Sequence, residues 1–176
     1  MKLYLLGFMG SGKSHVGKKL SARLQLPFLD LDDFIVEREG VSINEIFACK
    51  GEHGFRQIER KCLEETAEMD NVIIGCGGGT PCFFDNMEWL NKHGTTWYLN
   101  YPASVLFDRL KTRKAKRPLL KDMSDEQLLS FIEKKLEERA PYYEAAQFQY
   151  NYGREAQEAA TVIEEWHLKH SNSANG

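Results

Sequence analysis

A glycine-rich segment near the N-terminus carries the residues best suited to chemistry. It runs Gly7-Phe8-Met9-Gly10-Ser11-Gly12-Lys13-Ser14 and fits the pattern G-x-x-x-x-G-K-[ST] directly after an apolar run. Glycines let successive backbone N–H groups converge on one anion, and the helix expected next adds its N-terminal dipole. A lysine at this spacing reaches the β- and γ-phosphates of a nucleotide, and the serine hydroxyl is a Mg²⁺ ligand. The segment predicts a magnesium–nucleotide site comprising Gly10, Ser11, Gly12, Lys13, Ser14 and His15.

Two carboxylates follow the second apolar run. Asp30 and Asp32 are two residues apart, so both face the same side of a strand end and can reach the same crevice. One would hold Mg²⁺ through water, and the other would orient or deprotonate a hydroxyl acceptor. The equally weighted alternative is a cluster of helix N-caps, a role that fits Asp33 best.

A glycine run, Gly75-Cys76-Gly77-Gly78-Gly79, ends the third apolar run without an acid. A nucleotide-switch protein would be expected to place a metal-binding Asp there. Glycines instead favour close approach of a ligand to backbone N–H groups, with a flexible turn as the alternative.

Two arginines lie within expected helices. Arg56 and Glu59 have the i, i+3 spacing whose default interpretation is an exposed ion pair worth a few tenths of a kcal/mol. Arg139, near the end of a long helix, would bind a carboxylate bidentately or cap that helix.

Residues 109–121 carry seven basic residues and no acid. With Arg117-Pro118, this stretch fits a lid, at about 110–123, that closes over phosphates, excludes water and supplies a cation to the transition state. A nucleic-acid patch is the alternative, but the stretch lacks interleaved aromatic residues.

Apolar runs alternate with helical patterns along the chain, which indicates β–α–β units around a parallel sheet. The expected strands are residues 3–6, 27–29, 72–74, 96–99 and 148–150. The expected helices are residues 13–24, 52–69, 85–93, 103–110, 124–138 and 155–168, and Ser124 with Gln127 resembles a capping box. Residues 32–61 insert helical patterns where a short crossover would suffice.

Composition bounds the class of protein. The 176 residues predict a single domain, 1–176, and 42% hydrophobic with 28% charged residues is typical of a globular chain. The net charge of -3 argues against a general nucleic-acid binder.

The four cysteines lack a C-x-x-C pair and are expected to be free thiols, and His167 with His170 lies near a fraying end. With no 18-residue apolar run or signal-peptide pattern, we expect a cytoplasmic protein with no membrane partner. Nothing marks an interface, so a monomer is expected.

Taken together, these residues resemble the shikimate kinase family over roughly residues 3–150. The resemblance rests on the glycine-rich segment and five further motifs: Asp30-Leu31-Asp32, Gly51-Glu52-x-x-Phe55-Arg56-x-Ile58-Glu59, Gly77-Gly78-Gly79, Arg117-Pro118-Leu119-Leu120 and Arg139-x-Pro141-x-Tyr143. It implies a three-layer α/β/α P-loop kinase with a five-stranded parallel sheet, an inserted helical acceptor-binding lobe at about 32–61, and the lid.

The resemblance also implies an activity and a set of roles. The family phosphorylates the 3-hydroxyl of shikimate with ATP and Mg²⁺, in the route through chorismate to aromatic amino acids. Lys13 would stabilise the transferring group, Ser14 and Asp30 would hold Mg²⁺, and Arg117 would reach the phosphates. The acceptor-binding set implied is Asp32, Arg56, Glu59 in support of Arg56, Gly77, Gly78, Gly79 and Arg139. Asp32 would orient the reacting hydroxyl.

The chain departs from the family pattern beside the adenine. Family members often carry a proline just after the last strand, whereas this chain has Asn151-Tyr152-Gly153-Arg154-Glu155. The resemblance therefore leaves the adenine contacts open, including a stacking role for Arg113.

Three rival functions remain open from the sequence. A kinase for another polyol acid, such as gluconate, would share the glycine-rich segment, and the pairing of Arg56 with Arg139 favours shikimate. A GTPase would use Asn91-Lys92-His93-Gly94, which begins like N-K-x-D but lacks the Asp. A nucleic-acid binder would use residues 109–121.

Overall fold

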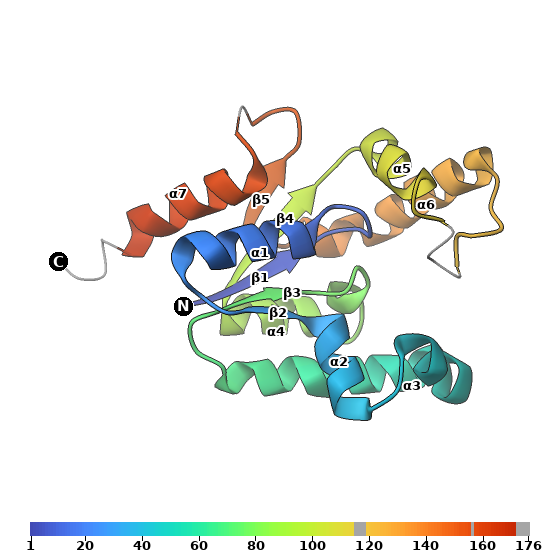
Figure 1. Ribbon diagram of the computed structural model, residues 1–176, viewed down its shortest axis with the longest axis horizontal. Coiled ribbons are helices and arrows are strands. Elements are labelled where there is room, and N and C mark those ends of the chain that lie inside the picture. The colour runs from blue at the N-terminus through green and yellow to red at the C-terminus, as the bar shows by residue number, and fades with distance from the viewer. Residues whose placement is uncertain (115–118, 156, 172–176) are drawn as a thin grey trace.

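A computed structural model describes residues 1–114, 119–155 and 157–171. Five parallel strands form one sheet in the order β2-β3-β1-β4-β5 (Figure 1). Their bounds are Lys2–Leu6 (β1), Phe28–Asp30 (β2), Val72–Gly75 (β3), Thr95–Asn100 (β4) and Phe148–Asn151 (β5). Each lies within one residue of its predicted position, because strands buried on both faces are short, continuous apolar runs.

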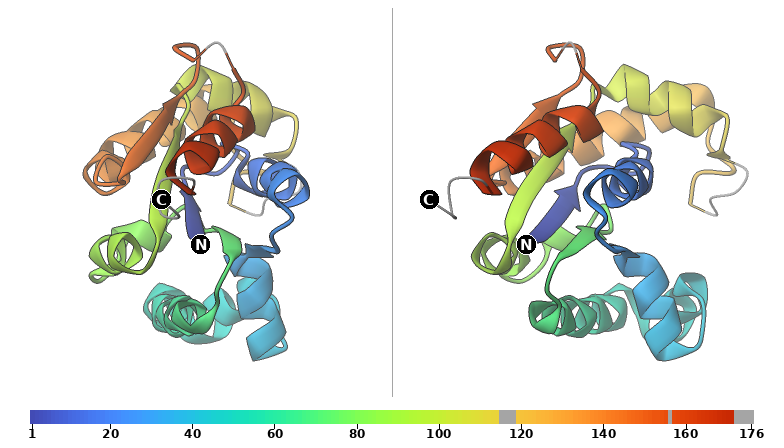
Figure 2. Two further views of the ribbon diagram at one scale, coloured as in Figure 1. Left: turned by 90° about the vertical axis from the view of Figure 1, so that its left-hand side faces the viewer. Right: turned by 60° about the vertical axis from the view of Figure 1, so that its left-hand side comes forward.

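Helices cover both faces of the sheet, which confirms the predicted three-layer α/β/α class (Figure 2). Their bounds are Lys13–Leu24 (α1), Leu31–Glu39 (α2), Ile43–Glu65 (α3), Asn86–His93 (α4), Ala103–Lys111 (α5), Asp125–Tyr143 (α6) and Ala159–Ser171 (α7). Two 3₁₀ turns, η1 and η2, span Thr66–Glu68 and Thr80–Cys82. Side chains alternate along β1, so Leu3 and Leu5 face one core while Tyr4 and Leu6 face the other.

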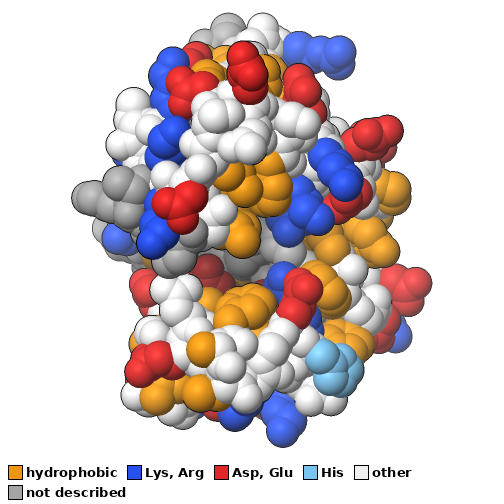
Figure 3. Space-filling model, turned by 90° about the vertical axis from the view of Figure 1, so that its right-hand side faces the viewer, with side chains coloured by type: hydrophobic (Ala, Val, Ile, Leu, Met, Phe, Trp, Pro, Cys, Tyr) orange, Lys and Arg blue, Asp and Glu red, His pale blue; other side chains and the backbone are white. Residues whose placement is uncertain are grey.

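The surface is hollowed at the carboxyl ends of the strands. Figure 3, seen from that end, shows a hollow between the part of the molecule with α2 and α3 and the part with α5 and α6. Charged side chains of both signs lie along its edges. The loops that follow β1 and β3 open at this end, and α2 begins there directly after β2, so residues placed just after those strands meet there.

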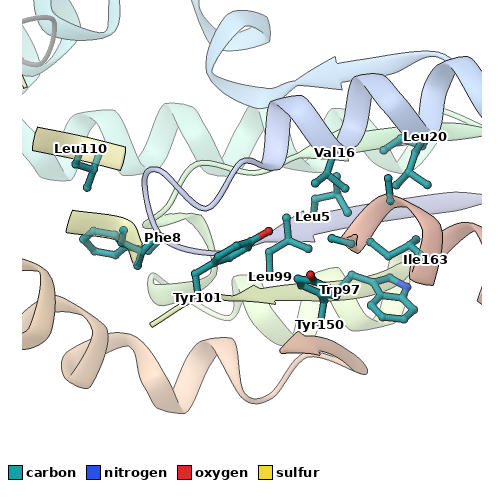
Figure 4. Close-up of a cluster of buried hydrophobic side chains, with 14 of the residues drawn as sticks. Leu5, Phe8, Val16, Leu20, Trp97, Leu99, Tyr101, Leu110, Tyr150 and Ile163 are labelled. Carbon is teal, nitrogen blue, oxygen red and sulfur yellow. The ribbon is translucent and has the colours of Figure 1, made fainter. Parts of the chain in front are cut away.

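One core holds α1 against the sheet and so fixes the loop that precedes it. Val16 of α1 lies over Leu5, Leu20 lies on the side of Ile163 of α7, and Ile163 lies beside Trp97 (Figure 4). The packing is tight, because a Cβ built on Gly17 would lie 2.1 Å from the ring of Phe28.

Several predicted helix bounds were wrong. The helix expected at 52–69 is α3, which begins at Ile43 on a capping box between Ser42 and Glu45 and bends at Gly51, where φ is +66°. It ends at Glu65, and Thr66–Glu68 is a 3₁₀ turn. Helix α6 continues past the predicted end at 138 to Tyr143, and α7 begins at Ala159 rather than at 155. The predicted capping box of Ser124 and Gln127 is confirmed.

Candidate active site

The loop between β1 and α1 has the conformation that its glycines predict. Gly7, Gly10 and Gly12 have positive φ of 146°, 82° and 91°. The Lys13 ammonium group donates to the carbonyl oxygens of Gly7 at 2.7 Å and Phe8 at 3.1 Å. No side chain caps the N-terminus of α1, so its first N–H groups face the hollow without a side-chain acceptor. This is an anion-binding geometry.

Asp30 joins this loop to the next helix. The Ser14 hydroxyl donates to its Oδ2 at 2.7 Å, and its Oδ1 accepts from the Asp32 backbone N–H at 3.2 Å. Asp30 is therefore the N-cap of α2, and the expectation that Asp33 would fill that role was wrong. Hydroxyl and carboxylate oxygens are the donors that Mg²⁺ prefers, so this pair fits a magnesium ion held partly by phosphates.

Asp32 faces a second carboxylate. A Cβ built on Gly77 would lie 3.1 Å from Asp32 Oδ1 and 3.2 Å from Glu59 Oε1, so these oxygens flank one glycine. Partial desolvation, with the negative charges of Asp30 and Glu59, raises the pKa of Asp32 to about 6, against the opposing pull of Lys13 and Arg56. At neutral pH, Asp32 is ionised and accepts hydrogen bonds.

Arg56 and Glu59 form a buried ion pair, so the default interpretation of an exposed pair was wrong. Arg56 Nη1 donates to Glu59 Oε2 at 2.8 Å, and the two residues are 8% and 1% exposed. The guanidinium group lies 4.0 Å from the ring of Phe83 and 5.1 Å from that of Phe55. Its Nη2 donates to Glu52 Oε1 at 3.4 Å, and its buried Nε has no hydrogen-bond partner among the described residues.

The glycine run links Arg56 with Arg139. Gly78 O accepts from Arg139 Nη1 at 3.1 Å and from Tyr143 Oη at 2.5 Å. A Cβ on Gly79 would lie 2.6 Å from Arg56 Nη2, and one on Gly78 would lie 3.4 Å from the backbone N of Met9. The run is thus packed against both arginines and the P-loop. The alternative of a flexible turn was therefore wrong for the glycine run. The alternative of a helix cap was wrong for Arg139, whose hydrogen bond goes to Gly78 O.

Arg109 is a candidate site residue that the sequence analysis did not single out. It donates to Gly10 O at 3.0 Å and to Ser11 O at 3.3 Å, and its guanidinium carbon lies 4.2 Å from the Tyr101 ring centre. A cavity of about 480 Å³ lies beside it, lined by Tyr101, Tyr150, Tyr152 and His15 among others. A neighbouring cavity of about 530 Å³ reaches Arg113. The only signal for Arg109 is its place in the basic stretch.

The basic stretch is only partly described. Arg117 and Pro118 lie outside the described residues, and so does part of the segment expected as a lid. Lys111 pairs with Asp108 at 2.7 Å, and Lys114 contacts Asp125 at 3.3 Å. These lysines are paired within the fold.

The side chain of Asn91, the first residue of the candidate guanine motif, forms hydrogen bonds within the fold. Asn91 accepts from the Thr96 hydroxyl at 2.6 Å and donates to Ala145 O, away from the carboxyl ends of the strands. Asn91 is therefore not placed to recognise guanine, which argues against the GTPase alternative.

The cysteines and histidines, which the sequence analysis did not expect to bind metal, form no metal centre in the part of the chain that the structure describes. No three His, Cys, Asp or Glu side chains there gather to hold a metal by themselves. All four cysteines are free thiols, as predicted. His170 stacks on Trp166 within α7, so the fraying end expected at His167 and His170 is helical. No described helix is long and apolar enough to cross a membrane.

The fold and the site together define a P-loop kinase for a small, negatively charged acceptor. A family model for shikimate kinase matches residues 9–167. The shikimate kinase of Bacteroides thetaiotaomicron is 46% identical over 151 residues, covering 86% of each chain. That of Salinibacter ruber is 41% identical over 171 residues, covering 94% of this chain and 83% of the relative. The chain belongs to the shikimate kinase family.

Solved structures agree with this assignment. A crystal structure of shikimate kinase from Bacteroides thetaiotaomicron matches with a TM-score of 0.87 and 42% identity, covering 94% of this chain and 97% of the other. A shikimate kinase from Acinetobacter baumannii, in complex with shikimate, matches with a TM-score of 0.80 and 33% identity. That match covers 98% of this chain and 93% of the other.

Proposed function

We infer that this chain transfers the γ-phosphoryl group of ATP to the 3-hydroxyl of shikimate, yielding shikimate 3-phosphate in the route to chorismate and aromatic amino acids. Family membership supports the activity, with ATP and Mg²⁺ as co-substrate and cofactor. The acceptor class rests on the position of two arginines. The Arg56 guanidinium group packs on Gly79, and Arg139 donates to the carbonyl oxygen of the neighbouring Gly78. The buried Nε of Arg56 has no partner among the described residues. Two guanidinium groups on one glycine run suit a carboxylate.

On the donor side, we propose that residues 10–15 surround the phosphates, His15 included. Lys13 would move from its two loop carbonyls to the β- and γ-phosphates and stabilise charge in the transition state. Ser14 and Asp30 would hold Mg²⁺, which when bound neutralises phosphate charge. The cavity beside Arg109 would take the nucleoside, with Tyr152 in the segment where family members often have a proline and the ring centre of Tyr101 4.9 Å from that of Tyr152.

On the acceptor side, we propose that Arg56 and Arg139 bind the shikimate carboxylate and Glu59 supports Arg56. Gly77, Gly78 and Gly79 would let the ring approach the backbone closely. Asp32 would accept a hydrogen bond from the 3-hydroxyl and direct its oxygen at the phosphoryl group. Its position near Lys13, Arg56 and Glu59 supports this role.

The two expected subregions stay proposals. Residues 32–61 would form the acceptor-binding lobe, because α2 and α3 carry Asp32, Arg56 and Glu59 to one side of the hollow. Residues 110–123 would act as a lid that brings Arg117 to the phosphates and excludes water. We also propose a cytoplasmic monomer, because the four thiols are free and one chain supplies all the proposed site residues.

Acceptor-dependent release of ADP tests the activity. Purified enzyme with MgATP would be given shikimate, gluconate or no acceptor, and ADP would be followed by a coupled assay. We expect turnover with shikimate and only background with the other two. Turnover with gluconate alone would contradict the acceptor assignment, and turnover indifferent to acceptor would contradict a kinase of this class.

A further inference from the structure

A chain of buried polar groups lies behind the Arg56–Glu59 pair. Glu59 uses Oε2 to accept from Arg56 and Oε1 to accept from the Thr80 hydroxyl, at 2.6 Å. Thr80 is fully buried at the start of η2, 21 residues from Glu59 in the chain. A buried carboxylate needs donors for both oxygens, and Thr80 supplies the one that Arg56 does not.

The Thr80 hydroxyl is held in place by the backbone around it. Thr80 N donates to Gly77 O at 3.1 Å, and Thr80 O accepts from Asn86 Nδ2 at 2.7 Å. Asn86, also fully buried, accepts in turn from Arg60 Nη1 at 2.7 Å, and Arg60 pairs with Asp85 at 2.8 Å. The chain of contacts thus runs from the hollow to the surface, with each member fixing the next.

Thr80 also lies where two carboxylates approach each other. A Cβ built on Gly77 would lie 3.0 Å from Thr80 Oγ1, 3.1 Å from Asp32 Oδ1 and 3.2 Å from Glu59 Oε1. The hydroxyl is therefore placed to hold Glu59 Oε1 against repulsion from Asp32. Without it, Glu59 would lose its Oε1 donor, and its hold on Arg56 would loosen.

The same short turn touches Arg56 from a second side. Phe83 follows η2 directly and places its ring 4.0 Å from the guanidinium carbon of Arg56. Glu59 binds Nη1, Glu52 binds Nη2 at 3.4 Å, and the buried Nε has no partner in the part of the chain that the structure describes.

We propose that Thr80 is a positioning residue for the acceptor: its hydroxyl fixes Glu59, and Glu59 holds the Arg56 guanidinium group beside the glycine run, where it would bind the acceptor carboxylate. The proposal rests on the proposed function. Thr80 touches neither substrate, so its effect belongs to acceptor binding rather than to phosphoryl transfer.

Thr80→Val tests this, because valine keeps the size of threonine and removes its donor. We expect the KM for shikimate to rise roughly tenfold, with kcat and the KM for MgATP within about twofold of wild type. Thr80→Ser, which keeps the hydroxyl, should restore the wild-type KM. Thr66→Val is the matched control: Thr66 is equally buried and bonds Leu63 O and Tyr4, outside the site. It should lower the melting temperature without changing the KM for shikimate.

A purely structural role would change kcat through the folded fraction, or both KM values together, and serine would not rescue selectively. An unchanged KM for shikimate in Thr80→Val would overturn the proposal. If the valine variant does not fold, Thr80→Ala against Thr80→Ser decides: equal KM values would contradict the role of the hydroxyl. Wild-type enzyme without shikimate-dependent turnover would instead refute the proposed function.

Discussion

At the scale of single residues, Lys13 is the cation that we propose for the phosphates. Its ammonium group is held by the carbonyl oxygens of Gly7 and Phe8, within the loop that would wrap the β- and γ-phosphates. No other residue of the loop carries a positive charge.

Lys13→Ala should therefore lower kcat by about 100-fold or more, since removal of one transition-state donor commonly costs that much. The fold should persist, because the loop keeps its glycines and α1 its buried face. Steady-state ADP release and a thermal melt measure the two effects. Lys18→Ala, on the exposed face of the same helix, should leave turnover near wild type. Turnover of Lys13→Ala within about twofold of wild type would remove Lys13 from the phosphate site.

Asp32 gives the reaction a pH dependence. Its pKa is raised to about 6, chiefly by desolvation and then by Asp30 and Glu59. If ionised Asp32 orients the hydroxyl, kcat/KM for shikimate should fall as the pH drops through about 6, and this limb should vanish in Asp32→Asn. A wild-type profile flat from about pH 7 to 5 would contradict the role.

The raised pKa of Asp32 affects folding stability in the opposite direction: ionisation favours the proposed reaction but lowers the stability of the fold. Because the folded-state pKa exceeds the ordinary value of 3.8, the folded state binds the proton more readily, and ionised Asp32 opposes folding above about pH 6. Asp32→Asn should thus gain most in melting temperature at neutral pH. The gain should shrink as the pH falls from about 6 to 4, which separates this effect from the kinetic one.

The residues of the P-loop could be predicted because their motif is local. Arg109 could not, since it contacts Gly10, which lies 99 positions away in the sequence. The burial of Arg56 and Glu59 was equally hidden. Their spacing predicts an ion pair, but Thr80 and Phe83, which help to bury and hold it, lie on another element.

At the scale of elements, the strands were the easiest to predict and α3 the hardest. Five buried apolar runs need no tertiary knowledge to be recognised. Helix α3 bends at Gly51, so its first part was recognised only as a helical pattern within residues 32–61, without a defined start, although Ser42-Ile43-Asn44-Glu45 is a capping-box pattern. The glycine run after β3 needed its neighbours: only the packing of α3 and α6 around it shows why three glycines are there.

Helix α6 supplies Arg139, the second arginine of the proposed acceptor site. Arg139→Ala should raise the KM for shikimate by about 10- to 100-fold, because a hydrogen bond to a charged group contributes about 1.5–3 kcal/mol. The KM for MgATP should change little. Initial-rate measurements with each substrate varied in turn test both expectations.

Lys135→Ala is the matched control on the same helix. Lys135 pairs only with Glu138 at 2.6 Å among the contacts described, at an exposed position where such a pair contributes little. Its loss should leave both KM values unchanged. An unaltered shikimate KM in Arg139→Ala would place the acceptor carboxylate elsewhere.

At the scale of the whole molecule, the sheet order brings donor and acceptor together. β1 lies between β3 and β4, so the P-loop that follows it has the glycine run after β3 directly alongside. α2 and α3 flank the hollow on one side, and α5 and α6 flank it on the other. The sequence predicted this class of fold, but not which side chains close the hollow, because those contacts join distant parts of the chain.

The most direct test of the account is the position of the new phosphate ester. Shikimate and MgATP would be incubated with the enzyme and followed by ³¹P NMR, with the ester located by its coupling to ring protons. We expect one phosphomonoester, coupled to the proton on carbon 3, formed in equal amount to ADP. An ester at another hydroxyl, or ADP accompanied only by inorganic phosphate, would contradict transfer to an oxygen oriented by Asp32.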